Sequence, residues 1–444
     1  MRNHWLILAA GVVGTLATLP GQTNGVSPFI DFLIDALAVS RNNLSLAYLV
    51  GTVCSAAIMP FAGAMYDRTD SRSISAAAGA ALGLSVLAIS FADRLTGALM
   101  QLLPMLSRAL VATAVMSVGF FLLRFFGQGV LNMTSRTMVM KWFDQRRGFA
   151  NAIMAPTIAL GFSYAPRVFD RMIATWGWRA SWQLMGAFLL LCFAGFALLF
   201  FKDPTEAESR YRPTRRGRWL QLPPTLSRAL RARAAIEPPR PEHDYTLKQA
   251  RRTRAFWIFN LVTGFASLVG TGLTFHVVNI FSAGELSRSL ALGVFFPSTV
   301  VAVTLQFGGS VISDYVRLRY FASLQALGSI LVMIGILFIG PGLPYLAIVV
   351  GMGLNSGLFA INSVITWPRF FGLSHLGSIS GANVVWVVAG SALGPYAFSL
   401  GQQLFGSYRP VALVLGLIAA GLFLTSFFAE NPNRASVANR QAGC

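Results

Sequence analysis

The stretch GAMYDRTDSR at residues 63–72 and the stretch SVISDYVRLR at residues 310–319 each follow a long apolar run. Both contain an aspartate followed five residues later by an arginine, as Asp67 and Arg72 in the first copy and Asp314 and Arg319 in the second. Each copy ends the second apolar run of one half of the chain. The repeat predicts two related halves, an organisation typical of membrane transporters that move around a central site.

Apolar runs extend outward from both copies along nearly the whole chain. A spanning helix needs about 20 mostly apolar residues, and the sequence offers twelve such runs. The polar stretch 202–254 separates the first six from the last six, which predicts an N-terminal six-helix bundle at 1–201, a linker at 202–254, a C-terminal bundle at 255–429 and a tail at 430–444. The expected spans are 6–26, 44–66, 74–92, 107–131, 148–168, 181–201, 256–276, 289–311, 320–340, 343–363, 381–400 and 410–429.

The composition excludes an ordinary soluble enzyme. The 444 residues are 55% hydrophobic and 11% charged, whereas a soluble domain carries roughly 25% charged residues. The sequence contains no nucleophile elbow, no phosphate-cradling glycine loop before a helix and no cluster of metal ligands. Its three cysteines are scattered. We therefore expect an all-α polytopic membrane protein of twelve helices that is not an enzyme and holds no cofactor or metal.

The net charge of +19 does not indicate nucleic-acid binding, because the basic residues lie in the gaps between apolar runs. If the N-terminus is cytoplasmic, loops on that side carry 26 of the 35 lysines and arginines and the other side carries 8. Cytoplasmic loops are the ones enriched in such residues. The expected location is the cell (inner) membrane with both termini in the cytoplasm, and the basic linker would lie near anionic headgroups.

Gly63, Asp67, Arg68 and Arg72 form a pattern that resembles the helix 2–3 loop signature of the major facilitator superfamily, although Asp70 replaces the usual glycine. The stretch RFFGQG at residues 124–129 resembles the second signature of that superfamily. The resemblance covers nearly the whole chain. It implies two six-helix halves, alternating access and a gating role for the loop residues Gly63, Asp67, Arg68, Arg72, Asp314 and Arg319. The alternative is an ordinary charged turn that obeys the positive-inside rule.

Further stretches resemble one branch of the superfamily, that of monocarboxylate-transporter-like and oxalate/formate-antiporter-like proteins. They are KWF at 141–143 with RRG at 146–148, FH at 275–276, FG at 371–372 and HLG at 375–377. This branch resemblance implies a small organic anion as substrate. Members of the branch commonly carry charged residues in helices 8 and 11, but here neither Ala291 to Gly309 nor the eleventh run holds one.

Arg124 is the one charged residue well inside an apolar run. Gln128 and Asn132 follow at i+4 and i+8, so the three share a helix face. Ionisable residues at membrane depth are costly and usually face a cavity. Arg124 and Gln128 are therefore candidate cavity residues, and the alternative for Arg124 is hydrogen bonding to carbonyls of a neighbouring helix.

Other polar and aromatic residues are candidates because helices 1, 4, 7 and 10 line the cavity in the superfamily that the chain resembles. Pro20-Gly21 predicts a break in the first helix, and groups near such a break often line a cavity. Asp31 and Asp35 follow that break. They are candidates for proton capture, and the alternative is that they are solvated loop or interfacial residues. The remaining substrate-cavity candidates are Gln22, Asn24, Tyr164, His276, Asn279, Asn355, Asn362 and Trp386, with interhelical hydrogen bonding or packing as the alternative for each.

The sequence thus favours a secondary active or facilitated transporter of a small organic solute, with a monocarboxylate-like anion preferred because Arg124 is the one deep charge. One alternative is an exporter of hydrophobic or neutral compounds, suggested by the uncharged helix 8. Another is a transporter-like sensor or interaction protein that acts through the linker. The expected partners are a small-molecule substrate, with or without a coupling ion, and the lipid bilayer, but no nucleic acid, and we expect a monomer.

Overall fold

The computed structural model describes residues 2–66, 69–143, 147–204, 244–313, 316–372 and 374–433. Gly63 lies near the end of a helix, while Asp67, Arg68 and Asp314 of the expected gating motif lie outside the described residues, as do 205–243 of the linker and 434–444 of the tail. The described residues fold into helices without a strand, which confirms the predicted fold class.

The first bundle begins with a helix that is broken. α1 (Arg2–Leu16) is followed by the short turns η1 (Leu19–Gly21), α2 (Thr23–Val26) and η2 (Ser27–Phe29) and then by α3 (Ile30–Leu37). Pro20 lacks an N–H and cannot continue a helix, so the break falls where the sequence predicted it. The other helices of this bundle are α4 (Arg41–Tyr66), α5 (Ser71–Ile89), α6 (Ala92–Leu102), α7 (Arg108–Leu122), η3 (Leu123–Leu131), α8 (Asn132–Trp142), α9 (Arg147–Ala187), η5 (Phe188–Phe193) and α10 (Ala194–Phe200).

The second bundle starts after the short helix α13 (Leu247–Ala250). Two of its helices begin at polar caps: Thr253 accepts a hydrogen bond from Phe256 N at the start of α14, and Ser287 accepts one from Leu290 N at the start of α15, as capping residues do. The helices are α14 (Arg254–Ser282), α15 (Arg288–Gly293), α16 (Phe295–Ile312), α17 (Leu318–Leu337), α18 (Leu343–Val364), α19 (Thr366–Phe371), α20 (Leu376–Phe405) and α21 (Arg409–Ser426).

Among the described residues, 11 helical runs are long and apolar enough to cross a membrane, and one of them, Ile153–Phe200, has 48 residues. Gly177 interrupts that run with φ of +78°, a conformation that glycine adopts at little cost. The run is therefore two spans, which gives the predicted twelve. The predicted span 107–131 was too short, because α7, η3 and α8 continue to Trp142.

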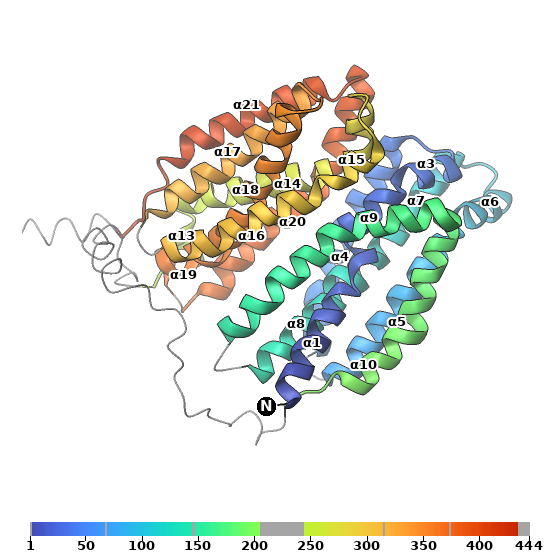
Figure 1. Ribbon diagram of the computed structural model, residues 1–444, viewed down its shortest axis with the longest axis horizontal. Helices are drawn as coiled ribbons and strands as arrows, with labels where there is room; N and C mark the ends of the chain where they lie inside the picture. Colours follow the sequence, from blue (N-terminus) through green and yellow to red (C-terminus); the bar gives the residue numbers. More distant parts are fainter. Residues whose placement is uncertain are drawn as a thin grey trace, which may run out of the picture.

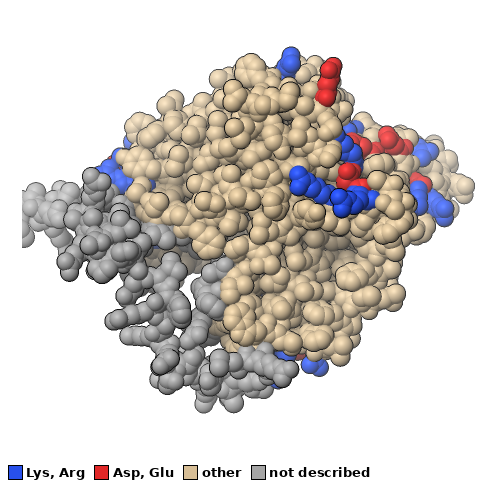
Figure 2. Space-filling view, viewed as in Figure 1, with Lys and Arg blue, Asp and Glu red and all other residues tan. Residues whose placement is uncertain are grey.

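The two bundles lie side by side and contact each other unevenly (Figure 1). They approach closely around α3, α9 and α15 and are further apart around α8 and α19. We call the end that carries the N-terminus and residues 202–204 the linker face, and the end that carries Gly177 and the start of α15 the opposite face. On the side seen in Figure 2, a broad belt over the helices shows no charged residue, and acidic and basic side chains gather near α3, α6 and α15.

Candidate functional site

The broken first span packs directly against the fourth span. η3, the middle of the fourth span, is a π-helix over Leu123–Leu131, and π-helical turns are frequent at functional sites. A Cβ added to Gly21 would lie 2.4 Å from the carbonyl oxygen of Leu123 and 2.8 Å from Cα of Gly127. Two glycines therefore bring the backbones together, and this close approach sets Thr23 next to Arg124.

Arg124 connects the two bundles at mid-depth. Its side chain is 6% exposed, and its Cζ lies 5.1 Å from the centre of the Tyr48 ring. The guanidinium donates to the Thr23 hydroxyl in the first bundle and to the Ser391 hydroxyl in the second, both at 3.4 Å. No acidic side chain among the described residues forms an ion pair with Arg124. The arginine is thus a buried positive charge held by neutral hydroxyls.

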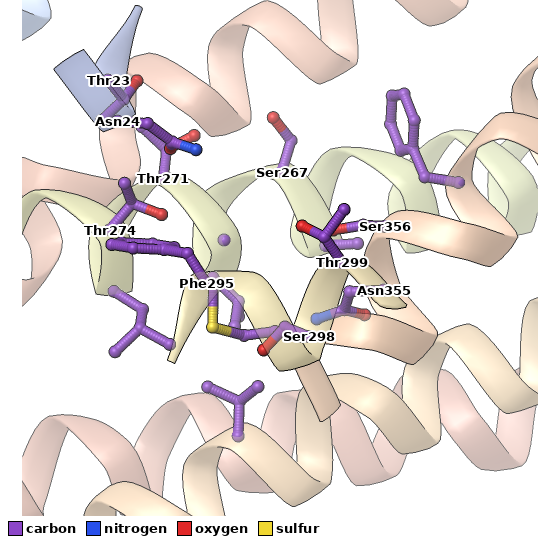
Figure 3. A pocket seen from close by; sticks show the side chains of 17 residues that line it. Thr23, Asn24, Ser267, Thr271, Thr274, Phe295, Ser298, Thr299, Asn355 and Ser356 are labelled. Carbon is purple, nitrogen blue, oxygen red and sulfur yellow. The ribbon is translucent and has the colours of Figure 1, made fainter. Parts of the chain in front are cut away.

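A cavity of about 350 Å³ adjoins Arg124. Thr23, which contacts Arg124, lines it, and so does Thr271, which donates to Ser391 at 3.1 Å. Only Thr23 and Asn24 come from the first bundle, and the other residues come from α14, α16, α17 and α18. The lining residues, shown in Figure 3, are Thr23, Asn24, Ala266, Ser267, Val269, Gly270, Thr271, Leu273, Thr274, Phe295, Ser298, Thr299, Val332, Met352, Asn355, Ser356 and Phe359.

Two of the predicted cavity residues, Asn24 and Asn355, line this cavity. The Asn355 side chain accepts a hydrogen bond from the Ser329 hydroxyl at 3.2 Å, and its Nδ2 has no partner among the described residues. Gln22 points back along its own span and donates to Thr18 at 3.1 Å. Gln128 is exposed on the linker-face side of Arg124 and is not part of the cavity lining.

His276 and Asn279, two further candidates for the cavity, have side chains in contact with other helices. The His276 side chain is fully buried, and Nε2 lies 2.8 Å from the Pro395 carbonyl oxygen. Asn279 accepts a hydrogen bond from the Tyr408 hydroxyl at 2.7 Å. The neighbouring Phe275 packs instead against the first bundle, with its ring centre 5.1 Å from that of Tyr48. The pair at 275–276 thus contacts both bundles and does not line the cavity.

The other three predicted cavity residues also lie elsewhere. Asn362 is buried and donates to Gln325 at 2.7 Å. Tyr164 lies edge-on to Phe296 across the two bundles, with ring centres 6.5 Å apart. Trp386 lies edge-on to Trp257 with ring centres 6.1 Å apart. For these three, the alternative of interhelical contact describes the observed geometry.

The cavity contains polar residues that the sequence analysis did not single out. Ser267, Thr271 and Thr274 line it from α14. Their spacing of i, i+4 and i+7 is the signal that could have revealed a shared helix face. Ser298 and Thr299 on α16, the eighth span, show no such periodic spacing. The uncharged sequence of this span gave no other sign that it lines the cavity.

Charged residues hold the bundles together at the opposite face. Arg288, at the start of α15, donates to Asp170 in α9 and to the carbonyl oxygen of Pro28, both at 2.6 Å, and lies 3.8 Å from Asp31. Asp31 also pairs with Arg41 at 2.5 Å. Between described residues, no hydrogen bond or ion pair joins the two bundles on the linker-face side of Arg124. The structure is therefore closed at the opposite face.

The repeated arginines, Arg72 and Arg319, make matching contacts on the linker face. Arg72 donates to the carbonyl oxygen of Phe201 at 3.3 Å, after the sixth span. Arg319 donates to the carbonyl oxygen of Phe427 at 3.2 Å, after the last span, and pairs with Glu430 at 2.9 Å. In each bundle, the repeated arginine thus connects the start of the third span to the end of the sixth.

Asp203, which was not a candidate from the sequence, adds to the contacts between the third and sixth spans of the first bundle. Its carboxylate accepts hydrogen bonds from the Ser71 N–H and hydroxyl, both at 2.7 Å, and pairs with Lys141 at 3.0 Å. Burial raises the pKa of this carboxyl, but the bonds from Ser71 and Lys141 outweigh burial and leave the pKa below its usual range. Among the described residues, no three His, Cys, Asp or Glu side chains gather as a metal site requires.

The sequence profile described as Major Facilitator Superfamily matches residues 7–395. No curated protein sequence matches this one. Two solved structures share the fold. A bacterial homolog of the human lysosomal transporter Spinster, in an inward-facing and unoccupied conformation, has a TM-score of 0.66 at 12% identity, with 96% of this chain and 98% of that chain covered. The nucleoside transporter NupG has a TM-score of 0.60 at 11% identity, with 97% and 99% covered.

The two structural likenesses concern the fold, since both identities are low. The profile match covers most of the chain, including both copies of the Asp–Arg repeat and Arg124. Both findings agree with two bundles that enclose a cavity at mid-depth beside a broken helix, the place where many transporters bind their substrates. The chain therefore belongs to the Major Facilitator Superfamily and is a multi-pass membrane transporter of small solutes.

Proposed function

We propose that this transporter carries a small organic anion with a single carboxylate, and that it works by alternating access. The observation that carries the proposal is Arg124, a buried guanidinium without an acidic partner among the described residues. An unpaired buried charge is costly, so a structure that retains one generally has a ligand or solvent to offset it. A carboxylate accepts two parallel hydrogen bonds from a guanidinium and matches it in shape.

The position of Arg124 supports a role in transport. The guanidinium contacts Thr23 in one bundle and Ser391 in the other, so a carboxylate that competes for it would loosen a contact between the bundles. A ligand shifts an equilibrium between two conformations only by binding them with different affinity. We propose that binding at Arg124 supplies that difference. The resemblance of residues 141–148 and 275–276 to the monocarboxylate-transporter-like branch points to the same substrate class.

We also propose that the linker face is cytoplasmic, since the loops there carry most of the lysines and arginines. The conformation closed at the opposite face is then the one open to the cytoplasm. The chain would lie in the cell membrane with both termini inside and act as a monomer.

The test is uptake of labelled short monocarboxylates into proteoliposomes that contain purified protein. The wild type is compared with Arg124→Gln, and Arg171→Gln is the control because Arg171 is an exposed arginine without an ion pair among the described residues. We expect Arg124→Gln to lower uptake at least tenfold and Arg171→Gln to leave it unchanged. Equal uptake by Arg124→Gln and wild type would reject the role of Arg124 in anion recognition. Absence of monocarboxylate uptake by the wild type would reject the anion assignment and favour the exporter of neutral compounds.

A further inference from the structure

Beyond the contact with Arg124, the cavity is rich in neutral hydrogen-bonding groups. Its lining includes seven hydroxyl and two amide side chains and no charged one. Leu273, Phe295, Met352 and Phe359 supply apolar surface between them. Pockets usually combine apolar walls with a few polar groups that fix orientation, and here nine of the 17 lining residues carry a hydroxyl or an amide.

Several of these polar groups have no partner within the protein. Asn355 is buried and its Nδ2 is unpaired among the described residues. The half-buried Ser267 and Thr299 and the exposed Ser356 make no hydrogen bond with another described residue. By contrast, Thr271 and Ser298 already donate their hydroxyl hydrogens to Ser391 and to the Val294 carbonyl oxygen. Buried polar groups in native structures are nearly always hydrogen-bonded to protein or to water. The Nδ2 of Asn355 therefore calls for a solute, or for ordered water that a solute replaces, and the three hydroxyls beside the cavity are free to bind the same solute.

The polar groups fall into two sets at different places in the cavity (Figure 3). Thr23, Asn24 and Thr271 lie together at one end, beside the contacts of Arg124. Thr299, Ser356 and Asn355 lie together at the other end, away from Thr23. A solute that spans the cavity would lie beside Thr23, which separates it from the guanidinium of Arg124, at the first end and would meet neutral hydrogen-bonding groups at the second.

The second end discriminates between classes of carboxylate. A second carboxylate placed there would lose part of its hydration without a counter-charge among the lining residues, which is unfavourable. An unsubstituted hydrocarbon chain would leave the hydroxyls and Asn355 unpaired, and sites built to hydrogen-bond a substrate reject analogues that lack the partner group. Neutral hydroxyl groups on the solute satisfy both conditions.

We propose that the cavity selects compact hydroxylated monocarboxylates, with the carboxylate toward Arg124 and the hydroxyl groups toward Thr299, Ser356 and Asn355. This inference rests on the proposed transport of a monocarboxylate and adds the chemistry of the rest of the molecule. The cavity volume of about 350 Å³ lies near the lower limit of ligand pockets, which suits a solute of about the size of a six-carbon acid.

The test uses three acids with six carbons each: gluconate, which carries hydroxyls, hexanoate, which carries none, and adipate, which carries a second carboxylate. Uptake of each labelled acid into proteoliposomes is measured alone, and uptake of labelled gluconate is also measured in competition with unlabelled gluconate, hexanoate or adipate. Wild type is compared with Thr299→Val, Ser356→Ala and Arg124→Gln. Thr304→Val is the matched control, because Thr304 lies on the same helix, is exposed and donates only to the Val300 carbonyl oxygen.

We expect gluconate to compete at least tenfold better than hexanoate or adipate. Thr299→Val and Ser356→Ala should each lower kcat/KM for gluconate by about tenfold, without weakening competition by hexanoate, and Thr304→Val should match wild type. If hexanoate or adipate competes as well as gluconate while Arg124→Gln abolishes uptake, the inference fails and the proposed function stands. If wild type carries none of the three acids, or if Arg124→Gln carries gluconate like wild type, the proposed function fails as well.

Discussion

Arg124 in the first bundle donates a hydrogen bond to the hydroxyl of Ser391 in the second bundle at 3.4 Å. The same guanidinium reaches Thr23 in the broken first span at the same distance. Thr23 also lines the cavity. Arg124, the one buried charged side chain among the described residues, therefore contacts both the second bundle and a residue of the cavity wall. This arrangement leads to specific predictions about the residues that hold Arg124 and those that close the molecule.

Gly21→Ala should disrupt the approach of the first span to the fourth. The added Cβ would lie 2.4 Å from the Leu123 carbonyl oxygen, so the backbones must move apart, at a cost of about 1–3 kcal/mol in stability. Thr23 then moves away from Arg124. We expect a lower thermal unfolding temperature and a loss of transport, measured by scanning fluorimetry and proteoliposome uptake. Gly195→Ala is the control, because a Cβ there meets nothing within 4 Å; equal behaviour of the two variants would refute the packing account.

Arg288→Ala should weaken closure at the opposite face. The substitution removes contacts with Asp170, Pro28 and Asp31 at once, and charge-assisted hydrogen bonds that are partly shielded from water contribute about 1.5–3 kcal/mol each. We expect the population to shift toward conformations that are open at this face. Double electron–electron resonance measures the distance between spin labels at positions 40 and 403, on the two bundles at the opposite face. The labels are attached in a variant without the native cysteines.

The control for this experiment is Arg171→Ala, which removes an exposed arginine next to Asp170. It should leave the distance distribution of the wild type unchanged. A distribution for Arg288→Ala that coincides with that of the wild type would show that these ion pairs do not determine closure.

Asp203→Asn should destabilise the first bundle at neutral pH by about 1–3 kcal/mol, because the amide replaces an anion that accepts from Ser71 and Lys141. The pKa of Asp203 is lowered in the folded protein. Its stabilising contribution is therefore complete above the unfolded-state carboxyl pKa of about 4 and is lost as the pH falls through the lower folded-state value. Thermal unfolding of wild type and variant from pH 3 to 7 checks this. A difference that is constant over the whole range would contradict it.

The sequence predicted the features that depend on composition and local chemistry. Apolar runs marked the spans, Pro20-Gly21 marked the break in the first span, and the depth of Arg124 in its run marked it as the central charge. Asn24 and Asn355 line the cavity, and they were candidates because the first and tenth spans line the cavity in the superfamily that the chain resembles.

The sequence did not predict which way His276 and Asn362 face. The position of a residue in a span gives its depth, whereas the partner of its side chain depends on how helices from distant parts of the chain pack. His276 meets Pro395, and Asn362 meets Gln325. The hydroxyls of Thr299 and Ser356 were overlooked for a related reason, because serine and threonine are also common at plain helix contacts in membranes.

The most direct test of the central claim compares ligand charge with the charge at position 124. Binding of gluconate and of its uncharged amide is measured by the thermal stabilisation of purified wild type and Arg124→Gln, since a bound ligand stabilises the folded protein by mass action. We predict that the wild type prefers the carboxylate by at least tenfold in apparent affinity and that Arg124→Gln binds both compounds with similar affinity. An equal preference for the carboxylate in both proteins would contradict the role of Arg124 in recognising the anion.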